Sequence, residues 1–253
     1  MTANNNQIPN QVMPPAPGTS RKLDNNDICT IILKMNYCYD QNKTVYCEVE
    51  IQNKKKWTRI DSSDFIACVQ TYFKNTYSKI LKQNDIKNLV PILNLHALNS
   101  GNQVEVHNRI ARIGDEIFIE TQNNNGEIIK ITSTDWSIIQ NSPVIFKRFT
   151  HQESLPIPTK GGSIDDLFSI FSIKNVDEQI MIGTWLVSTL FTNIPGPHLW
   201  IVGDEGSGKT TLALSLKKLI DPVSRGNFMY KNTNEMAQTI DHHAVPFFDN
   251  FTK

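Results

Sequence analysis

The chain has 253 residues, and its 25 basic and 25 acidic side chains give a formal net charge of zero. A chain of this length can bury a real core and fits one large domain or two small ones. The neutral balance excludes a strongly basic protein that coats nucleic acid, but not a local basic groove. A hydrophobic share of 39% and the lack of any apolar run of about 18 residues argue against a membrane-spanning chain, so we expect no membrane partner.

The first part of the chain and the cysteines favour a cytoplasmic protein. Residues 1 to about 26 are rich in Asn, Gln and Pro and lack an apolar segment, which predicts a disordered tail and no secretory signal. The four cysteines form no C-x-x-C pair, so we expect free thiols, not a zinc site. Unpaired cysteines are typical of a reducing compartment.

Residues 27–155 are predicted to form an α+β accessory region. Its first part is rich in β-branched and aromatic residues, which predicts strands at 28–35 and 44–51. Three lysines followed by an aromatic residue, at 54–57, predict a basic turn. Such a pairing can contact a nucleic-acid backbone, although a solvated turn is the more common explanation.

Two helices and several strands complete this region. One helix is predicted from Ser62 or Ser63 to Leu81, and a second from Asp85 to Leu98, in which Pro91 indicates a kink or a later start. Alternating apolar residues predict strands at 103–113, 116–121 and 128–132, followed by extended chain at 136–149. Proline and glycine residues between 156 and 162 then mark a boundary, after which we place a second domain at 160–253.

The second domain alternates helices and short apolar strands, which predicts an α/β fold. Helices are expected at 164–171, 176–191, 211–220 and 233–242, and strands at 198–202, 227–230 and 244–249. The helix at 176–191 is apolar almost all round, so we expect it to be buried.

The loop after the strand at 198–202 has the spacing G-x-x-x-x-G-K-T, which is the P-loop pattern. Glycines let backbone N–H groups close around phosphate oxygens, and the following helix adds its positive dipole end. Lys209 is expected to reach the β- and γ-phosphates, and the Thr210 hydroxyl to ligate Mg²⁺. We therefore predict that ATP and Mg²⁺ bind at Gly203, Asp204, Glu205, Gly206, Ser207, Gly208, Lys209, Thr210 and Thr211. The Asp204 and Glu205 side chains would repel phosphate, so we expect them to face solvent or a neighbouring subunit.

A P-loop also needs an acidic partner on a neighbouring strand, and the apolar run 244–249 ends in Asp249. Asp249 is predicted to act as the Walker B carboxylate and metal ligand, although Pro246 counts against a central strand. Asn250 follows, where many ring ATPases have a glutamate base; an asparagine can position water but cannot take its proton. Lys209, Asp249 and Asn250 are the predicted catalytic residues.

The chain resembles a known family at several short stretches. Gly161–Leu167 precedes a helix with Trp185-Leu186, and the P-loop is followed by Leu219-Ile220-Asp221-Pro222 and by Phe247–Phe251. This succession resembles the ATPase module of phage and plasmid replication proteins, the primase–helicase type of mobile elements. The strands at 104–131 and the segment 143–149 resemble the part before the motor in the same proteins, so the resemblance covers about residues 45–253.

The resemblance implies a helicase-like ATPase that acts on DNA during replication and assembles as a homo-oligomeric ring. It also implies a sensor strand and an arginine finger after the Walker B strand, so we expect an incomplete P-loop domain that hydrolyses ATP only in the complete protein. Two alternatives stay open. One is a small-molecule phosphotransferase with the same P-loop, and the other is a module that binds nucleotide without hydrolysis.

Overall fold

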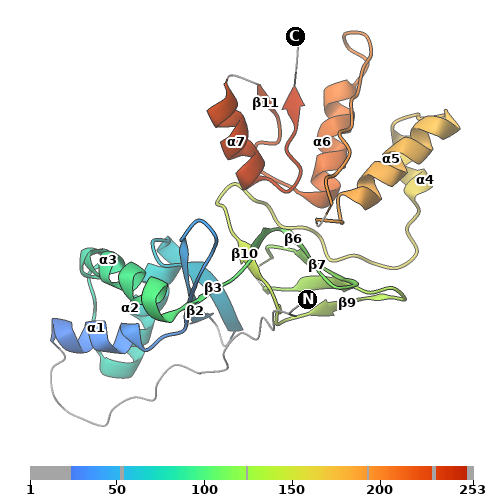
Figure 1. Cartoon of the computed structure of the whole chain (residues 1–253). Helices are drawn as coiled ribbons and strands as arrows, with labels where there is room; N and C mark the ends of the chain where they lie inside the picture. The colour runs from blue at the N-terminus through green and yellow to red at the C-terminus, as the bar shows by residue number, and fades with distance from the viewer. Residues whose placement is uncertain (1–23, 52–53, 124, 193, 230–231, 250–253) are drawn as a thin grey trace, which may run out of the picture. The chain divides into compact units, whose positions relative to one another are not determined.

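The computed structural model describes residues 24–51, 54–123, 125–192, 194–229 and 232–249 (Figure 1). The chain divides into two compact units, the first ending at Val106 and the second starting at His107. This division lies about fifty residues before the boundary expected from the sequence near residue 160. The predicted disordered tail falls mostly on residues 1–23, which lie outside the described residues; Asp24 to Asn26 already belong to the first helix and its cap.

The first unit contains three helices and a four-stranded sheet. In chain order its elements are α1 (Asn25–Leu33), β1 (Tyr37–Tyr39), β2 (Val45–Ile51), β3 (Lys54–Arg59), α2 (Ser63–Tyr77), α3 (Gln83–Ser100) and β4 (Asn102–Gln103). The strand order is β3-β2-β1-β4, in which β1 and β3 are antiparallel to β2, and β4 is parallel to β1. The prediction at 44–51 is thus confirmed.

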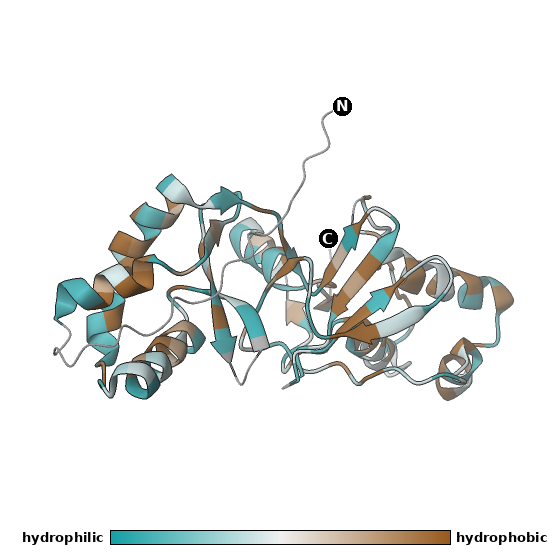
Figure 2. Ribbon diagram, turned by 90° about the horizontal axis from the view of Figure 1, so that it is seen from below, coloured by the Kyte–Doolittle hydropathy of each residue, from teal (hydrophilic) through white to brown (hydrophobic). Residues whose placement is uncertain are grey.

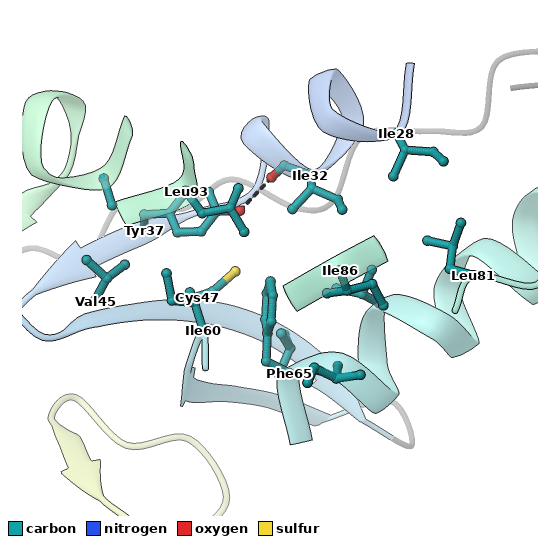
Figure 3. Packing of buried hydrophobic residues seen from close by; sticks show 14 of the residues in the cluster. Ile28, Ile32, Tyr37, Val45, Cys47, Ile60, Phe65, Leu81, Ile86 and Leu93 are labelled. Atoms are coloured by element: carbon teal, nitrogen blue, oxygen red, sulfur yellow. Dashed lines mark hydrogen bonds between the residues drawn. The ribbon is translucent and has the colours of Figure 1, made fainter. Parts of the chain in front are cut away.

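The core of the first unit lies between its helices and one face of β2. Val45, Cys47 and Val49 alternate along that strand and pack with residues of all three helices, including Ile32, Phe65 and Leu93 (Figure 3). The Tyr37 hydroxyl group, enclosed by this core, donates a hydrogen bond of 2.7 Å to the Ile32 carbonyl oxygen. Hydrophobic residues follow one side of these helices and hydrophilic residues the other (Figure 2), as amphipathic helices on a sheet require. The four cysteines are free thiols, as predicted.

Two predictions in the first unit are wrong. Residues 28–35 lie mostly in helix α1 and not in a strand, because Asp24 and Asp27 form a reciprocal capping box that starts a helix. The lysines at 54–56 lie in strand β3 and not in a turn. Helix α3 starts before Pro91 and runs through it, so the later start is also excluded.

The second unit contains short strands followed by helices. Its elements are β5 (Val106–Asn108), β6 (Ile110–Ile113), β7 (Glu116–Glu120), β8 (Ile128–Ile131), β9 (Trp136–Ile139), β10 (Ile145–Lys147), α4 (Ile164–Ile170), α5 (Val176–Ser188), α6 (Lys209–Ile220), β11 (Phe228–Met229), α7 (Thr233–His242) and β12 (Phe248–Asp249). Strands β6 to β9 form an antiparallel meander, β5 pairs with β10, and β11 pairs with β12 in parallel.

One hydrophobic cluster joins the meander to the later helices of this unit. Ile110 and Ile119 of the meander pack in the same cluster as Ile220 at the end of α6 and Val245 before β12. Trp185 and Leu186 of α5 contact this cluster from the side. The segment 107–155 therefore shares a core with the segment that carries the P-loop, which explains why the two belong to one unit.

The mixed α/β class agrees with the prediction, but two details of the second unit differ from it. No strand ladder includes residues 198–202 in the described part of the chain, although their side chains alternate: Leu199 and Ile201 contact the core, whereas Trp200 and Val202 are 68% and 89% exposed. Helix α5 is not buried all round, because only its face with Ile182 packs inward and Ile180 is 60% exposed. Across the described residues, none of the helices is both long and apolar enough to cross a membrane.

Candidate functional site

The predicted P-loop forms a tight turn that ends at the first residue of helix α6. Gly206 and Gly208 have φ angles of +77° and +81°, a backbone region that side chains with a Cβ atom rarely adopt. Gly208 is also the N-cap of α6, and a glycine has no side chain with which to cap the first turn. The first amide groups of α6 are therefore left for water or a ligand, at the positive end of the helix dipole.

The loop closes on the carbonyl oxygen of Asp204. This oxygen accepts hydrogen bonds from the Ser207 hydroxyl at 2.8 Å, the Ser207 amide at 3.3 Å and the Lys209 ammonium at 2.5 Å. A Cβ atom at Gly203 would lie 3.0 Å from the Ser207 hydroxyl oxygen, so a larger residue there would crowd the turn. Lys209 thus lies across its own loop and is half-buried.

The two acidic residues of the loop lie at the surface. Asp204 and Glu205 are exposed, which is consistent with the expectation that their side chains face solvent. Thr211 lies exposed in the first turn of α6, next to Thr210.

Thr210 and Asp249 lie together although 39 residues separate them in the sequence. The Thr210 hydroxyl is 3.3 and 3.4 Å from the two carboxylate oxygens of Asp249. Asp249 is the last residue of β12, and its parallel neighbour β11 ends at Met229. The carboxyl ends of this strand pair therefore meet the N-terminus of α6, the arrangement in which open α/β folds bind ligands.

The chemistry of these groups suits a magnesium ion. A hydroxyl and a carboxylate are hard oxygen donors, and Mg²⁺ is commonly held by one or two such groups together with water and phosphate oxygens. No group of three or more His, Cys, Asp or Glu residues among the described residues could hold a metal by itself. Any metal here would need oxygen ligands from a bound molecule as well. Asn250, the predicted water-positioning residue, lies outside the described residues.

A buried charged cluster lies at the opposite end of α6. Arg109 and Asp221 are both fully buried, and the Arg109 Nε atom donates to an Asp221 carboxylate oxygen at 2.8 Å. The guanidinium also donates to the carbonyl oxygens of Pro222 at 3.0 Å and Glu153 at 3.1 Å. Arg109 therefore links the segment 107–155 to the chain that leaves α6.

The second cation of this cluster comes from α6 itself. Lys217 is 2% exposed, and its ammonium donates to the other Asp221 carboxylate oxygen at 2.8 Å and to the Val245 carbonyl oxygen at 2.5 Å. The same Asp221 oxygen accepts from the Val245 amide at 3.3 Å. His243, also buried, has its Nδ1 atom 3.4 Å from the Lys217 ammonium.

Burial and neighbouring charges shift the pKa values of Asp221 and Lys217 in opposite directions. Burial alone would raise the pKa of Asp221, but the contact with His243 and the charges of Lys217 and Arg109 outweigh it and hold the pKa well below its ordinary value. Since His243 is 3.8 Å from the carboxylate and the two cations are 2.8 Å away, we attribute most of the lowering to the cations. Burial lowers the pKa of Lys217, and Asp221 offsets only part of this.

The described basic side chains of strand β3, Lys55, Lys56 and Arg59, all lie beside carboxylates. Lys55 pairs with Glu48 at 3.7 Å, Lys56 with Asp64 at 2.6 Å, and the nearby Arg59 with Asp61 at 2.6 Å. Because these three described cations already have carboxylate partners, they give no support to the nucleic-acid interpretation of the lysine run.

The sequence predicted the loop and Asp249 but not the charged cluster at the far end of α6. Asp221 and Lys217 had a weak signal, since Asp221 lies in the Leu-Ile-Asp-Pro stretch and Lys217 occupies a position near the apolar face of α6. Arg109 had none, because a single arginine between two apolar strands looks like an ordinary surface residue. Comparisons with protein-family models, curated proteins and solved structures find no match to this chain.

Proposed function

We propose that this protein binds ATP with Mg²⁺ at the loop Gly203–Thr210, with Asp249 as the acidic partner. The observation that carries the proposal is the approach of the Thr210 hydroxyl to the Asp249 carboxylate at 3.3 Å. A P-loop alone is a common pattern, but a strand-end carboxylate beside its Ser/Thr hydroxyl is the specific requirement for a metal–nucleotide site. Thr210 and Asp249 would hold the Mg²⁺, which would neutralise the charge of the phosphate groups.

Each residue of the loop has a distinct role in this proposal. The amides at the start of α6 bind phosphate oxygens, and Lys209 exchanges the Asp204 carbonyl oxygen for the β- and γ-phosphates. Gly206 and Gly208 allow the backbone turn that exposes those amides. Thr210 and Asp249 orient the metal. Hydrolysis of ATP, ring assembly and action on DNA in replication are part of the proposal, and they rest on the resemblance to primase–helicase motors.

Equilibrium binding of ATP in the presence of Mg²⁺ tests the site. In the Lys209→Ala variant we expect affinity to fall roughly 10- to 100-fold, the loss typical for hydrogen bonds to a charged group. Lys218→Ala is the matched control, because Lys218 is exposed on the same helix and should bind as the wild type does. Equal affinity of the wild type and Lys209→Ala would contradict the site assignment.

Turnover measurements separate the proposed motor from its alternatives. In the complete protein we expect phosphate release that rises when DNA is added. Phosphate transfer to a small acceptor that DNA does not affect would favour a phosphotransferase, and saturable binding without turnover would favour a non-hydrolysing module.

A further inference from the structure

The backbone of Val245 is held by side chains and not by a neighbouring strand. Its carbonyl oxygen accepts from Lys217 at 2.5 Å, and its amide donates to Asp221 at 3.3 Å. Among the described residues no strand ladder includes Val245, and the next residue, Pro246, has no N–H group to donate. Lys217 and Asp221 therefore take the place of the ladder that would normally hold this segment.

Helix α6 contacts the segment 245–249 at two places. Thr210, in its first turn, lies beside Asp249, and Lys217 and Asp221, at its end, hold Val245. The segment thus runs antiparallel to the helix, and Thr210 and Lys217 are about 10 Å apart along the helix axis. Two contacts at this separation fix both the position and the direction of the segment.

The charges of this buried cluster do not balance, and such a cluster is not expected to stabilise the fold by itself. Two buried cations, Arg109 and Lys217, face the single carboxylate of Asp221. Burying a surplus charge is unfavourable, and apolar side chains of similar volume often stabilise such sites as well or better. Arg109 also adopts a left-handed backbone conformation with φ of +62°, which is uncommon for a residue other than glycine. A cluster of this kind calls for a role beyond packing.

We propose that Lys217 and Asp221 are positioning residues for Asp249. They fix the backbone at Val245 against α6, so that the chain four residues later places the Asp249 carboxylate beside Thr210. Arg109 holds the Asp221 carboxylate from its other oxygen and prevents it from turning away. This inference rests on the proposed function, because the arrangement matters only if Asp249 serves a metal–nucleotide complex.

The test is the gain in ATP affinity that Mg²⁺ produces, measured as the ratio of dissociation constants without and with the metal. In Lys217→Met we expect metal-free ATP affinity to stay within about twofold of the wild type, because the phosphate loop is unchanged. The gain from Mg²⁺ should fall roughly tenfold or more, as for other residues that orient metal ligands. Asp249→Asn should lose the same gain, and the exposed neighbour variant Lys218→Met should keep it.

Lys217→Met should fold, because it leaves Arg109 and Asp221 as a balanced pair. A purely structural role would lower the melting temperature and leave the Mg²⁺ ratio unchanged, which would overturn the inference. If the wild type itself gains nothing from Mg²⁺, or if Asp249→Asn keeps the gain, the proposed function fails instead.

A measurement on the wild type does not depend on any variant. Binding of Mg²⁺–ATP should slow hydrogen exchange at the Val245 amide more than ATP with a chelator does, because a metal that stabilises Asp249 also stabilises the contacts that position it. Equal exchange at Val245 under both conditions would contradict the positioning role, whatever Lys217→Met does.

Discussion

Asp221 is the residue on which the buried charge of the second unit depends. Both cations of the cluster donate to its carboxylate, and its oxygen also accepts from the Val245 amide. If the carboxylate is lost, Arg109 and Lys217 stay buried without a counter-charge. Removal of one member of a buried ion pair usually costs more than the pair contributes, because the remaining charge keeps its desolvation penalty.

We therefore expect Asp221→Asn to lower the free energy of unfolding of the second unit by roughly 3–5 kcal/mol. Urea unfolding followed by circular dichroism would measure this. Asp115→Asn is the matched control, since the Asp115 side chain is 95% exposed and its change should stay within about 0.5 kcal/mol. A loss below about 1 kcal/mol for Asp221→Asn would show that the cluster is not a buried ion network in solution.

Individual residues of the candidate site could be predicted only where they belong to a recognisable local sequence pattern. The glycines, Lys209 and Thr210 follow a fixed spacing, and Asp249 ends an apolar run. Arg109 could not be predicted and Lys217 had only a weak signal, because their roles arise from burial by segments distant in the sequence. Lys217 and Lys218 are adjacent lysines, and only the packing of α6 makes one buried and the other exposed.

At the scale of elements, helices with clear end signals were predicted well. Helix α7 has the expected range 233–242, because Asn232 caps its start and the chain turns extended at His243. Helix α1 was not predicted, because its isoleucines suggested a strand and its N-cap Asp24 fell in the segment interpreted as a tail, three residues before its capping-box partner Asp27. The segment 198–202 alternates like a strand, but alternation alone cannot supply the neighbour that a strand needs.

In helix α3 the low helix propensity of Pro91 opposes the tertiary packing that keeps the segment helical. Pro91 is exposed in the middle of its 18 residues, where it cannot donate a helical hydrogen bond. Pro91→Ala should stabilise the first unit, by up to about 3 kcal/mol, the difference between the two residues in an exposed helix interior. Thermal unfolding would measure this difference. Asn88→Ala is the comparison variant, because Asn88 is also exposed on α3. A lower melting temperature for Pro91→Ala would mean that the helix needs the proline geometry.

At the scale of the whole molecule, the sequence suggested the class of fold but not its division. Proline and glycine residues near 156–162 suggested a domain boundary, yet the chain there continues within one unit. The backbone of residues 151–155 bonds to the chain after α6: the Glu153 amide donates to the Pro222 carbonyl oxygen at 2.9 Å, and the Ser224 amide to that of His151 at 2.8 Å. Such long-range bonds leave no mark in local composition.

The division predicts how fragments behave. Residues 107–253 should fold with a cooperative thermal transition, and so should residues 1–106, because each contains its own core. Residues 160–253 should not, because this fragment lacks Arg109 and the meander that covers Ile220 and Val245. Circular dichroism melting of the three fragments would decide this, and a cooperative transition for 160–253 would place the boundary where the sequence suggested it.

The ion pair between Arg109 and Asp221 joins residues 112 positions apart, and this separation has a consequence for folding order. Closing so long a loop costs chain entropy before any contact compensates for it, so the pair forms late. During synthesis the first unit can complete its core while Arg109 is still hydrated and without its carboxylate. The second unit becomes compact only when α6 and the chain beyond it have been made, and the P-loop therefore acquires its final surroundings later than the first unit completes its core.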